Sequence, residues 1–82
     1  MLPEEKVYAM IQLELDHAKS NSFCRTLVLQ IIKYSEFFDE FRITSAEIAR
    51  KLDLPQFAYA QIALARAIFK DLKRSGLNAQ QL

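Results

Sequence analysis

Residues 41–77 read FRITSAEIARKLDLPQFAYAQIALARAIFKDLKRSGL, and this stretch decides the fold class. It contains a clear helix start signal, because Thr44 precedes Glu47 by three residues. At this capping-box spacing the threonine oxygen accepts a hydrogen bond from the glutamate amide, while the glutamate carboxylate reaches back. The pattern predicts a short helix over 45–53.

A second, longer helix is expected over 55–75. Pro55 suits the first turn of a helix, where its missing N–H would have no partner. Gly76 suits the left-handed residue that follows a helix, and Leu77 is placed to contact Leu72 in a Schellman ending. The apolar residues of this segment recur at helical spacing and predict an inward stripe of Ala58, Ile62, Ala65, Phe69 and Leu72.

The preceding residues predict two further helices, over 3–19 and 22–38. Segment 22–38 is the most hydrophobic and follows the helical period closely, so it is the expected centre of the core. With one Gly and two Pro in 82 residues, the chain has too few turn residues for an all-β fold. We predict a single all-α domain over 1–82, with an extra N-terminal helix, a three-helix core (22–77) and a loose tail (78–82).

The composition excludes several functional classes. Hydrophobic residues make up 51% of the chain and charged residues 26%, which is a globular balance without an apolar run of the roughly 20 residues that span a bilayer. Cys24 and His17 are single residues of their kinds, so neither an internal disulfide nor a zinc site is expected, and the cysteine is expected to be buried. The chain lacks a nucleophile, base and acid set and is too short for a large cleft. We expect a cytoplasmic, non-enzymatic protein without a cofactor or metal.

The two halves of the chain differ in charge. Residues 1–41 hold four bases and seven acids, whereas residues 42–82 hold seven bases and three acids, and the net charge of the whole is +1. Several of these bases fall in the last turns of the predicted helices, where the helix dipole favours cations. The basic half is therefore interpreted either as a solvated face or as a nucleic-acid-binding surface.

The segments RITSAEIARKLDL and AIFKDLKRSGL resemble bacterial and phage helix-turn-helix domains of the winged-helix type. Asp53 stands where the compact motif usually has glycine, and the five residues after Leu77 are too few for a wing, so the resemblance is to a wingless form. The matching positions are Thr44, Ile48, Ala49, Leu52 and Leu54 in the first segment, and Phe69, Leu72, Gly76 and Leu77 in the second.

The resemblance implies a small regulator of transcription or replication that binds double-stranded DNA, with the helix over 55–75 in the major groove. A dimer is expected, because one domain of this size makes few phosphate contacts. The implied DNA-binding residues are Arg42, Arg50, Lys51, Gln56, Tyr59, Gln61, Arg66, Lys70, Lys73 and Arg74. The expected dimerisation or bracing residues are Val7, Met10, Ile11, Leu13 and Leu15 of the first helix.

An alternative function is protein–protein interaction. The outward side of the last helix is rich in alanine, and an exposed apolar patch usually marks an interaction site. In this interpretation the protein is an adaptor, inhibitor or assembly factor, and the partner contacts Ala60, Ala63, Leu64 and Ala67.

Overall fold

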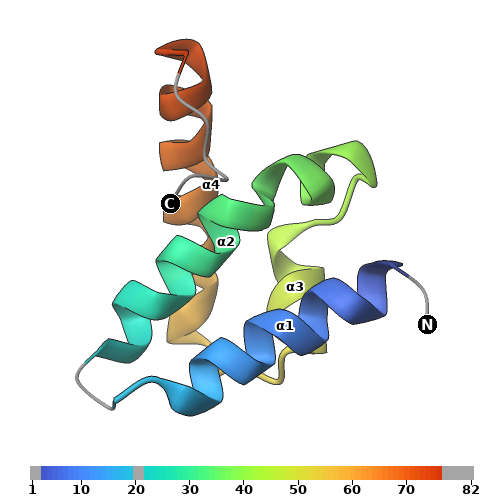
Figure 1. The fold of residues 1–82 in the computed structure, drawn as a ribbon, viewed down its shortest axis with the longest axis vertical. Helices are drawn as coiled ribbons and strands as arrows, with labels where there is room; N and C mark the ends of the chain where they lie inside the picture. The colour runs from blue at the N-terminus through green and yellow to red at the C-terminus, as the bar shows by residue number, and fades with distance from the viewer. Residues whose placement is uncertain (1–2, 20–21, 77–82) are drawn as a thin grey trace.

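The most hydrophobic segment of the chain forms the helix against which two of the others pack. The computed structural model describes residues 3–19 and 22–76, and within these ranges the chain forms four helices and no strand. The helices are α1 (Pro3–His17), α2 (Phe23–Glu40), α3 (Ser45–Lys51) and α4 (Phe57–Arg74) (Figure 1). Helix α2 packs against α1 and α4, and α4 also packs against α3. The prediction of an all-α domain is confirmed.

The apolar faces of the four helices meet in one core. In α4 the predicted inward stripe is buried, except for Leu72, which is half-buried at the end of the helix. The hydroxyl of Ser35, which is fully buried in α2, donates a hydrogen bond to the carbonyl oxygen of Ile31 at 2.6 Å, so its polar group is satisfied. The other buried residues of α2 are Leu27, Ile31, Ile32 and Phe38, as the helical period predicts.

Helix α3 begins as the sequence predicts. The Oγ1 atom of Thr44 accepts a hydrogen bond from the backbone N–H of Glu47 at 3.1 Å. The Glu47 carboxylate lies 4.0 Å from the guanidinium of Arg50 on the exposed side of the helix. The cap is thus confirmed on its threonine side. The short helix is held to the core by Ile43, Ile48 and Leu52, which are all buried.

Helix α3 ends at Lys51, two residues earlier than predicted, because Asp53 has a left-handed backbone with a φ of 51°. The N–H of Asp53 donates to the carbonyl of Arg50 at 3.1 Å, and the N–H of Leu54 donates to the carbonyl of Ala49 at 3.0 Å. These two bonds make a Schellman ending, a motif that usually has glycine at the left-handed position. Aspartate tolerates this conformation better than most residues do.

Helix α2 ends in the same way, two residues later than predicted. Arg42 has a φ of 55°, and its N–H donates to the carbonyl of Asp39 at 3.2 Å. The N–H of Ile43 donates to the carbonyl of Phe38 at 2.8 Å. A left-handed arginine is uncommon, so this ending carries backbone strain that a glycine would relieve.

Helix α4 begins at Phe57, two residues later than the predicted start at Pro55. The carbonyl of Pro55 accepts a hydrogen bond from the N–H of Ala58 at 2.9 Å, so the proline lies in the turn before the helix. At the other end Gly76 has the predicted left-handed backbone, with a φ of 82°. Leu77 and the predicted tail over 78–82 lie outside the described residues.

Helix α1 buries two of the residues that were expected for dimerisation or bracing, Ile11 and Leu15. Its buried residues are Tyr8, Ile11 and Leu15. The ring of Tyr8 packs against that of Phe38 in α2, with centroids 6.1 Å apart. Cys24, at the start of α2, is exposed, which corrects the expectation that it would be buried.

A candidate interaction surface on α4

Helix α4 carries an apolar face on the side opposite its buried stripe. We call it the α4 outer face. Its two large side chains are accessible, because Phe57 is 57% exposed and Leu64 is 53% exposed. The inner side of α4 is occupied by α2 and α3, which leaves this face open among the described residues. The α4 outer face comprises Phe57, Ala60, Ala63, Leu64 and Ala67, all of which are exposed.

Polar residues extend the α4 outer face at both ends. Residues three, four and seven positions apart lie on one side of a helix. By this rule Gln56 lies before the first turn of the face, and Lys70, Asp71 and Arg74 continue it toward the helix C-terminus. All four are exposed. The face therefore runs from an aromatic end at Phe57 through a small-residue middle to a mainly cationic end.

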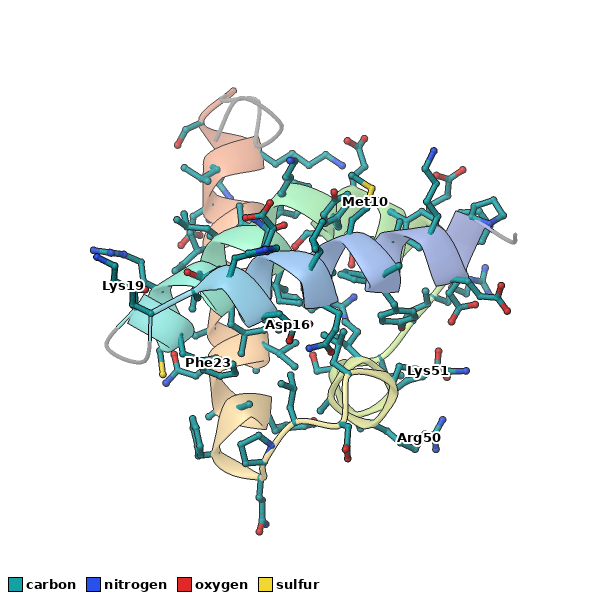
Figure 2. All side chains as sticks on the ribbon, turned by 60° about the horizontal axis from the view of Figure 1, so that its bottom comes forward. Met10, Asp16, Lys19, Phe23, Arg50 and Lys51 are labelled. Carbon is teal, nitrogen blue, oxygen red and sulfur yellow. The ribbon has the colours of Figure 1, made fainter. Side chains whose placement is uncertain are left out.

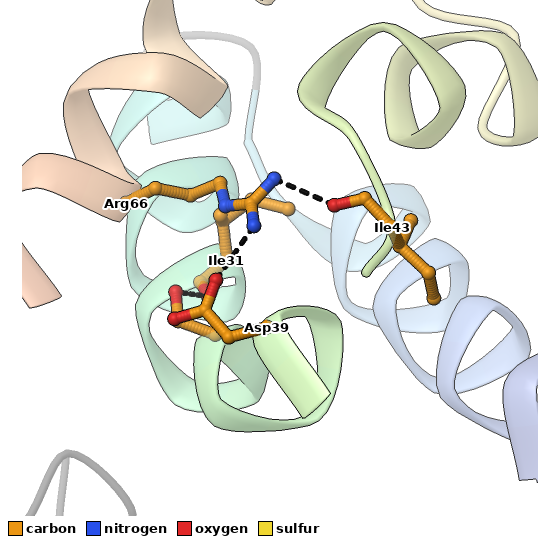
Figure 3. A network of polar contacts seen from close by, with 5 residues as sticks. Ile31, Asp39, Ile43 and Arg66 are labelled. Atoms are coloured by element: carbon orange, nitrogen blue, oxygen red, sulfur yellow. Dashed lines mark hydrogen bonds and ion pairs between the residues drawn. The ribbon is translucent and has the colours of Figure 1, made fainter. Parts of the chain in front are cut away.

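Arg66, which was predicted to bind DNA, makes its polar contacts within the protein. Its Nη1 atom donates to the carbonyl oxygen of Ile43 at 2.7 Å, and its Nη2 atom donates to the Asp39 carboxylate at 2.6 Å (Figure 3). The arginine side chain is only 19% exposed. It ties α4 to the end of α2 and to the loop before α3, and it is not part of the α4 outer face.

The other basic residues predicted to bind DNA lie at separate places on the protein surface. Arg50 and Lys51 project from α3 on the side away from α4 (Figure 2). Lys51 lines a cavity of about 290 Å³ together with Glu4 and Glu5 of α1. Each of these bases thus has acidic neighbours, which reduces the local positive potential.

A similar mixture of charges surrounds the end of α4. Lys73 lines a hollow of about 490 Å³ with three acids at the end of α2, which are Glu36, Asp39 and Glu40. Its ammonium group also lies 6.0 Å from the centroid of the Phe69 ring. Arg42, Lys70 and Arg74 are exposed. Of the uncharged residues predicted to bind DNA, Gln56 and Tyr59 are exposed and Gln61 is half-buried.

The predicted dimerisation residues of α1 separate into two groups. Ile11 and Leu15 lie in the protein's own core, 0% and 5% exposed, so they are not available to a second copy. Val7 is half-buried against this core. Met10 and Leu13 are exposed, and the sulfur of Met10 accepts a hydrogen bond from the Tyr34 hydroxyl at 3.8 Å. Helix α1 packs against α2, and of the five residues expected to take part in dimerisation or bracing, Met10 and Leu13 are the two that are exposed.

Tyr8 was not among the residues predicted to be functional, and it lines the cavity between α1 and α3. Its hydroxyl is buried and has no hydrogen-bond partner among the described residues. The pKa of Tyr8 is raised to about 12, mainly by burial and in smaller part by the carboxylates of Glu4 and Glu47, while the Arg50 guanidinium acts in the opposite direction. The spacing of Tyr8, Ile11 and Leu15 was the available signal, because these residues fall three and four positions apart.

Comparisons with known proteins do not indicate what the α4 outer face binds. No family model, no curated protein and no solved structure matches the chain. The similarity of residues 41–77 to helix-turn-helix domains therefore stays a prediction. In the described ranges, no helix has the length and apolar character needed to cross a membrane. The same residues contain no group of three His, Cys, Asp or Glu side chains that could hold a metal ion.

Proposed function

We propose that the protein is a non-enzymatic protein-interaction module, and that the α4 outer face is its binding surface. The observation that supports this proposal is the continuity of the face. Phe57, Leu64 and three alanines lie on one side of a single helix and are all exposed. Such a surface loses its contact with water when a second helix packs on it, and the small residues allow close approach of the two backbones.

The chemistry of this face favours a protein over DNA as its occupant. In a helix-turn-helix protein the recognition helix presents polar side chains to base edges. Here the middle of the α4 outer face presents alanine and leucine side chains and its N-terminal end presents the ring of Phe57, while Arg66 is bonded to Asp39 and Ile43. Such a surface offers few donors or acceptors for reading DNA sequence.

Position-specific photo-crosslinking in the native cells tests the proposal. A photoreactive amino acid replaces Leu64 on α4 or, in the matched control, Leu13 on α1. The two leucines are nearly equally exposed, at 53% and 56%. We expect a protein adduct from position 64 and none from position 13. If position 64 forms no adduct while the variant remains folded, the α4 outer face is not a binding surface.

DNA binding is the second candidate function, and a different observation favours it. Helices α3 and α4 pack against each other, α3 has the Thr44 cap, and the left-handed Asp53 in the connection between them occupies the position where the compact motif has glycine. Arg42, Lys70 and Arg74 are exposed in the basic half of the chain. These residues would supply phosphate contacts rather than base contacts.

Fluorescence anisotropy with random-sequence duplex DNA at two salt concentrations tests this second function. DNA binding predicts an affinity that falls steeply with salt and that weakens when Lys70 and Arg74 are both replaced by alanine. Lys33→Ala, at an exposed position of α2, is the control. If the protein does not bind DNA at low salt, its basic half is a solvated face.

A further inference from the structure

We propose that the occupant of the α4 outer face is the same face of a second copy of the chain, packed antiparallel about a two-fold axis between Ala63 and Leu64. This inference rests on the proposed function and names the partner. It follows from the distribution of residues along α4, because the two ends of the face differ in chemistry and complement each other.

The direction of pairing follows from the charges. In a parallel pair, Lys70 and Arg74 of one copy would lie beside the same cations of the other. Like charges in close contact destabilise an interface. In an antiparallel pair, the cationic end of one helix lies beside the aromatic end of the other. Lys70 then approaches Phe57 of the second copy, where an ammonium group and an exposed ring attract each other.

The register follows from the size of the side chains. An axis between Ala63 and Leu64 places Ala60 opposite Ala67 of the second copy, so small residues meet near the middle of the contact between the two α4 helices, which we call the seam. Leu64 then fills the space beside the alanines, as a large residue does when it packs between small ones on a facing helix. The same register brings Gln56 to Asp71 of the second copy, and the amide can donate to this carboxylate.

The expected affinity of the dimer follows from the length of this seam between the two α4 helices. From Phe57 to Lys70 an α-helix rises about 20 Å. Stable specific interfaces bury at least roughly 1,200 Å² of surface, and a single pair of helices over this length buries less than that. We therefore expect a reversible dimer that forms at micromolar or higher protein concentration.

Sedimentation equilibrium over a range of protein concentrations tests the occupant. We expect the wild-type chain to dimerise and Leu64→Lys to weaken dimerisation at least tenfold, while circular dichroism shows an unchanged helix content. Leu13→Lys, at the matched exposed leucine of α1, is expected to dimerise like wild type. Ala63→Arg provides a second disruption at the proposed axis. A wild-type chain that stays monomeric, or a dimer lost only in Leu13→Lys, would overturn the inference.

Cysteine cross-linking tests the direction and register. In a Cys24→Ser background, chains carrying Ala60→Cys and chains carrying Ala67→Cys are treated with a short thiol-to-thiol cross-linker, alone and mixed. The antiparallel seam predicts efficient cross-linking only in the mixture. Cross-linking of Ala60→Cys chains to each other would indicate a parallel pair and contradict the proposed geometry.

The outcomes separate this inference from the function on which it rests. If the photo-crosslinked adduct at position 64 contains a different protein and the chain is monomeric, the surface binds protein but its occupant is not a second copy. If position 64 forms no adduct at all, the proposed function itself fails.

Discussion

The guanidinium of Arg66 in α4 lies 2.6 Å from the carboxylate of Asp39 in α2, a residue 27 positions earlier in the chain. The same side chain donates to the carbonyl of Ile43, in the loop that leads to α3. One arginine therefore joins three parts of the fold. This role explains why Arg66 lies away from the α4 outer face, and it gives the residue a function in stability.

We expect Arg66→Ala to lower the free energy of unfolding by about 2 kcal/mol, because it leaves the Ile43 carbonyl without its charged donor. The ion pair itself contributes a smaller part, since the Asp39 side chain is 42% exposed and water weakens the attraction. Urea unfolding followed by circular dichroism measures the change. Lys33→Ala, at an exposed position of α2, is the control and is expected to change stability by less than about 0.5 kcal/mol.

Replacing Asp39 alone separates the two bonds of Arg66. Asp39→Asn is expected to cost less than Arg66→Ala, because the bond from Arg66 to the Ile43 carbonyl remains. Equal losses in the two variants would mean that the ion pair, and not the carbonyl contact, holds α4 to this end of α2.

Two left-handed residues provide a prediction of increased stability. Arg42→Gly and Asp53→Gly are each expected to raise the free energy of unfolding by about 0.5–1 kcal/mol, because glycine adopts a positive φ without steric cost. The gain is expected to be larger at Arg42, since aspartate already tolerates this conformation. Thermal unfolding at fixed pH measures both. Lys51→Gly, inside the last turn of α3, is the matched control and is expected to destabilise.

These helix ends also show what the sequence could and could not predict. The period of apolar residues predicted the buried stripes of α2 and α4, and Thr44 predicted the start of α3, because spacing and capping act over a few residues. The ends of α2 and α3 were misplaced by two residues each. Both end on left-handed residues that are not glycine, so the usual signal for a helix end was absent.

The candidate site was predictable only in part, because contacts between residues far apart in the sequence decide which side chains remain exposed. The alanines and Leu64 were identified from the period of α4 alone. The contact between Arg66 and Asp39 depends on how α2 crosses α4, which no local pattern encodes. In α1, Ile11 and Leu15 were expected for dimerisation or bracing, but they lie with Tyr8 on the buried side of the helix, where Tyr8 packs on Phe38 of α2.

The Tyr8 hydroxyl has no hydrogen-bond partner within residues 3–19 and 22–76, so we expect its removal to be tolerated. A buried hydroxyl without a hydrogen-bond partner costs about 1–3 kcal/mol, and a phenylalanine ring keeps the packing against Phe38. We expect Tyr8→Phe to raise the free energy of unfolding at pH 7 by about 1 kcal/mol. Urea unfolding measures the change. A loss of stability of similar size would show that the hydroxyl has a partner in solution.

The raised pKa of Tyr8 also predicts a specific loss of stability in alkaline solution. The hydroxyl titrates near 10.0 in the unfolded chain and near 12 in the folded protein. Between these values the unfolded state has released a proton that the folded state retains, so the free energy of unfolding falls as the pH rises. The loss from this group reaches about 2 kcal/mol at the upper end of the range. Tyr8→Phe is expected to remove this part of the pH dependence, whereas Tyr59→Phe, at an exposed tyrosine, is expected to leave it in place. Unfolding curves of the two variants between these pH values measure the difference, and parallel pH profiles would show that burial does not raise the pKa of Tyr8.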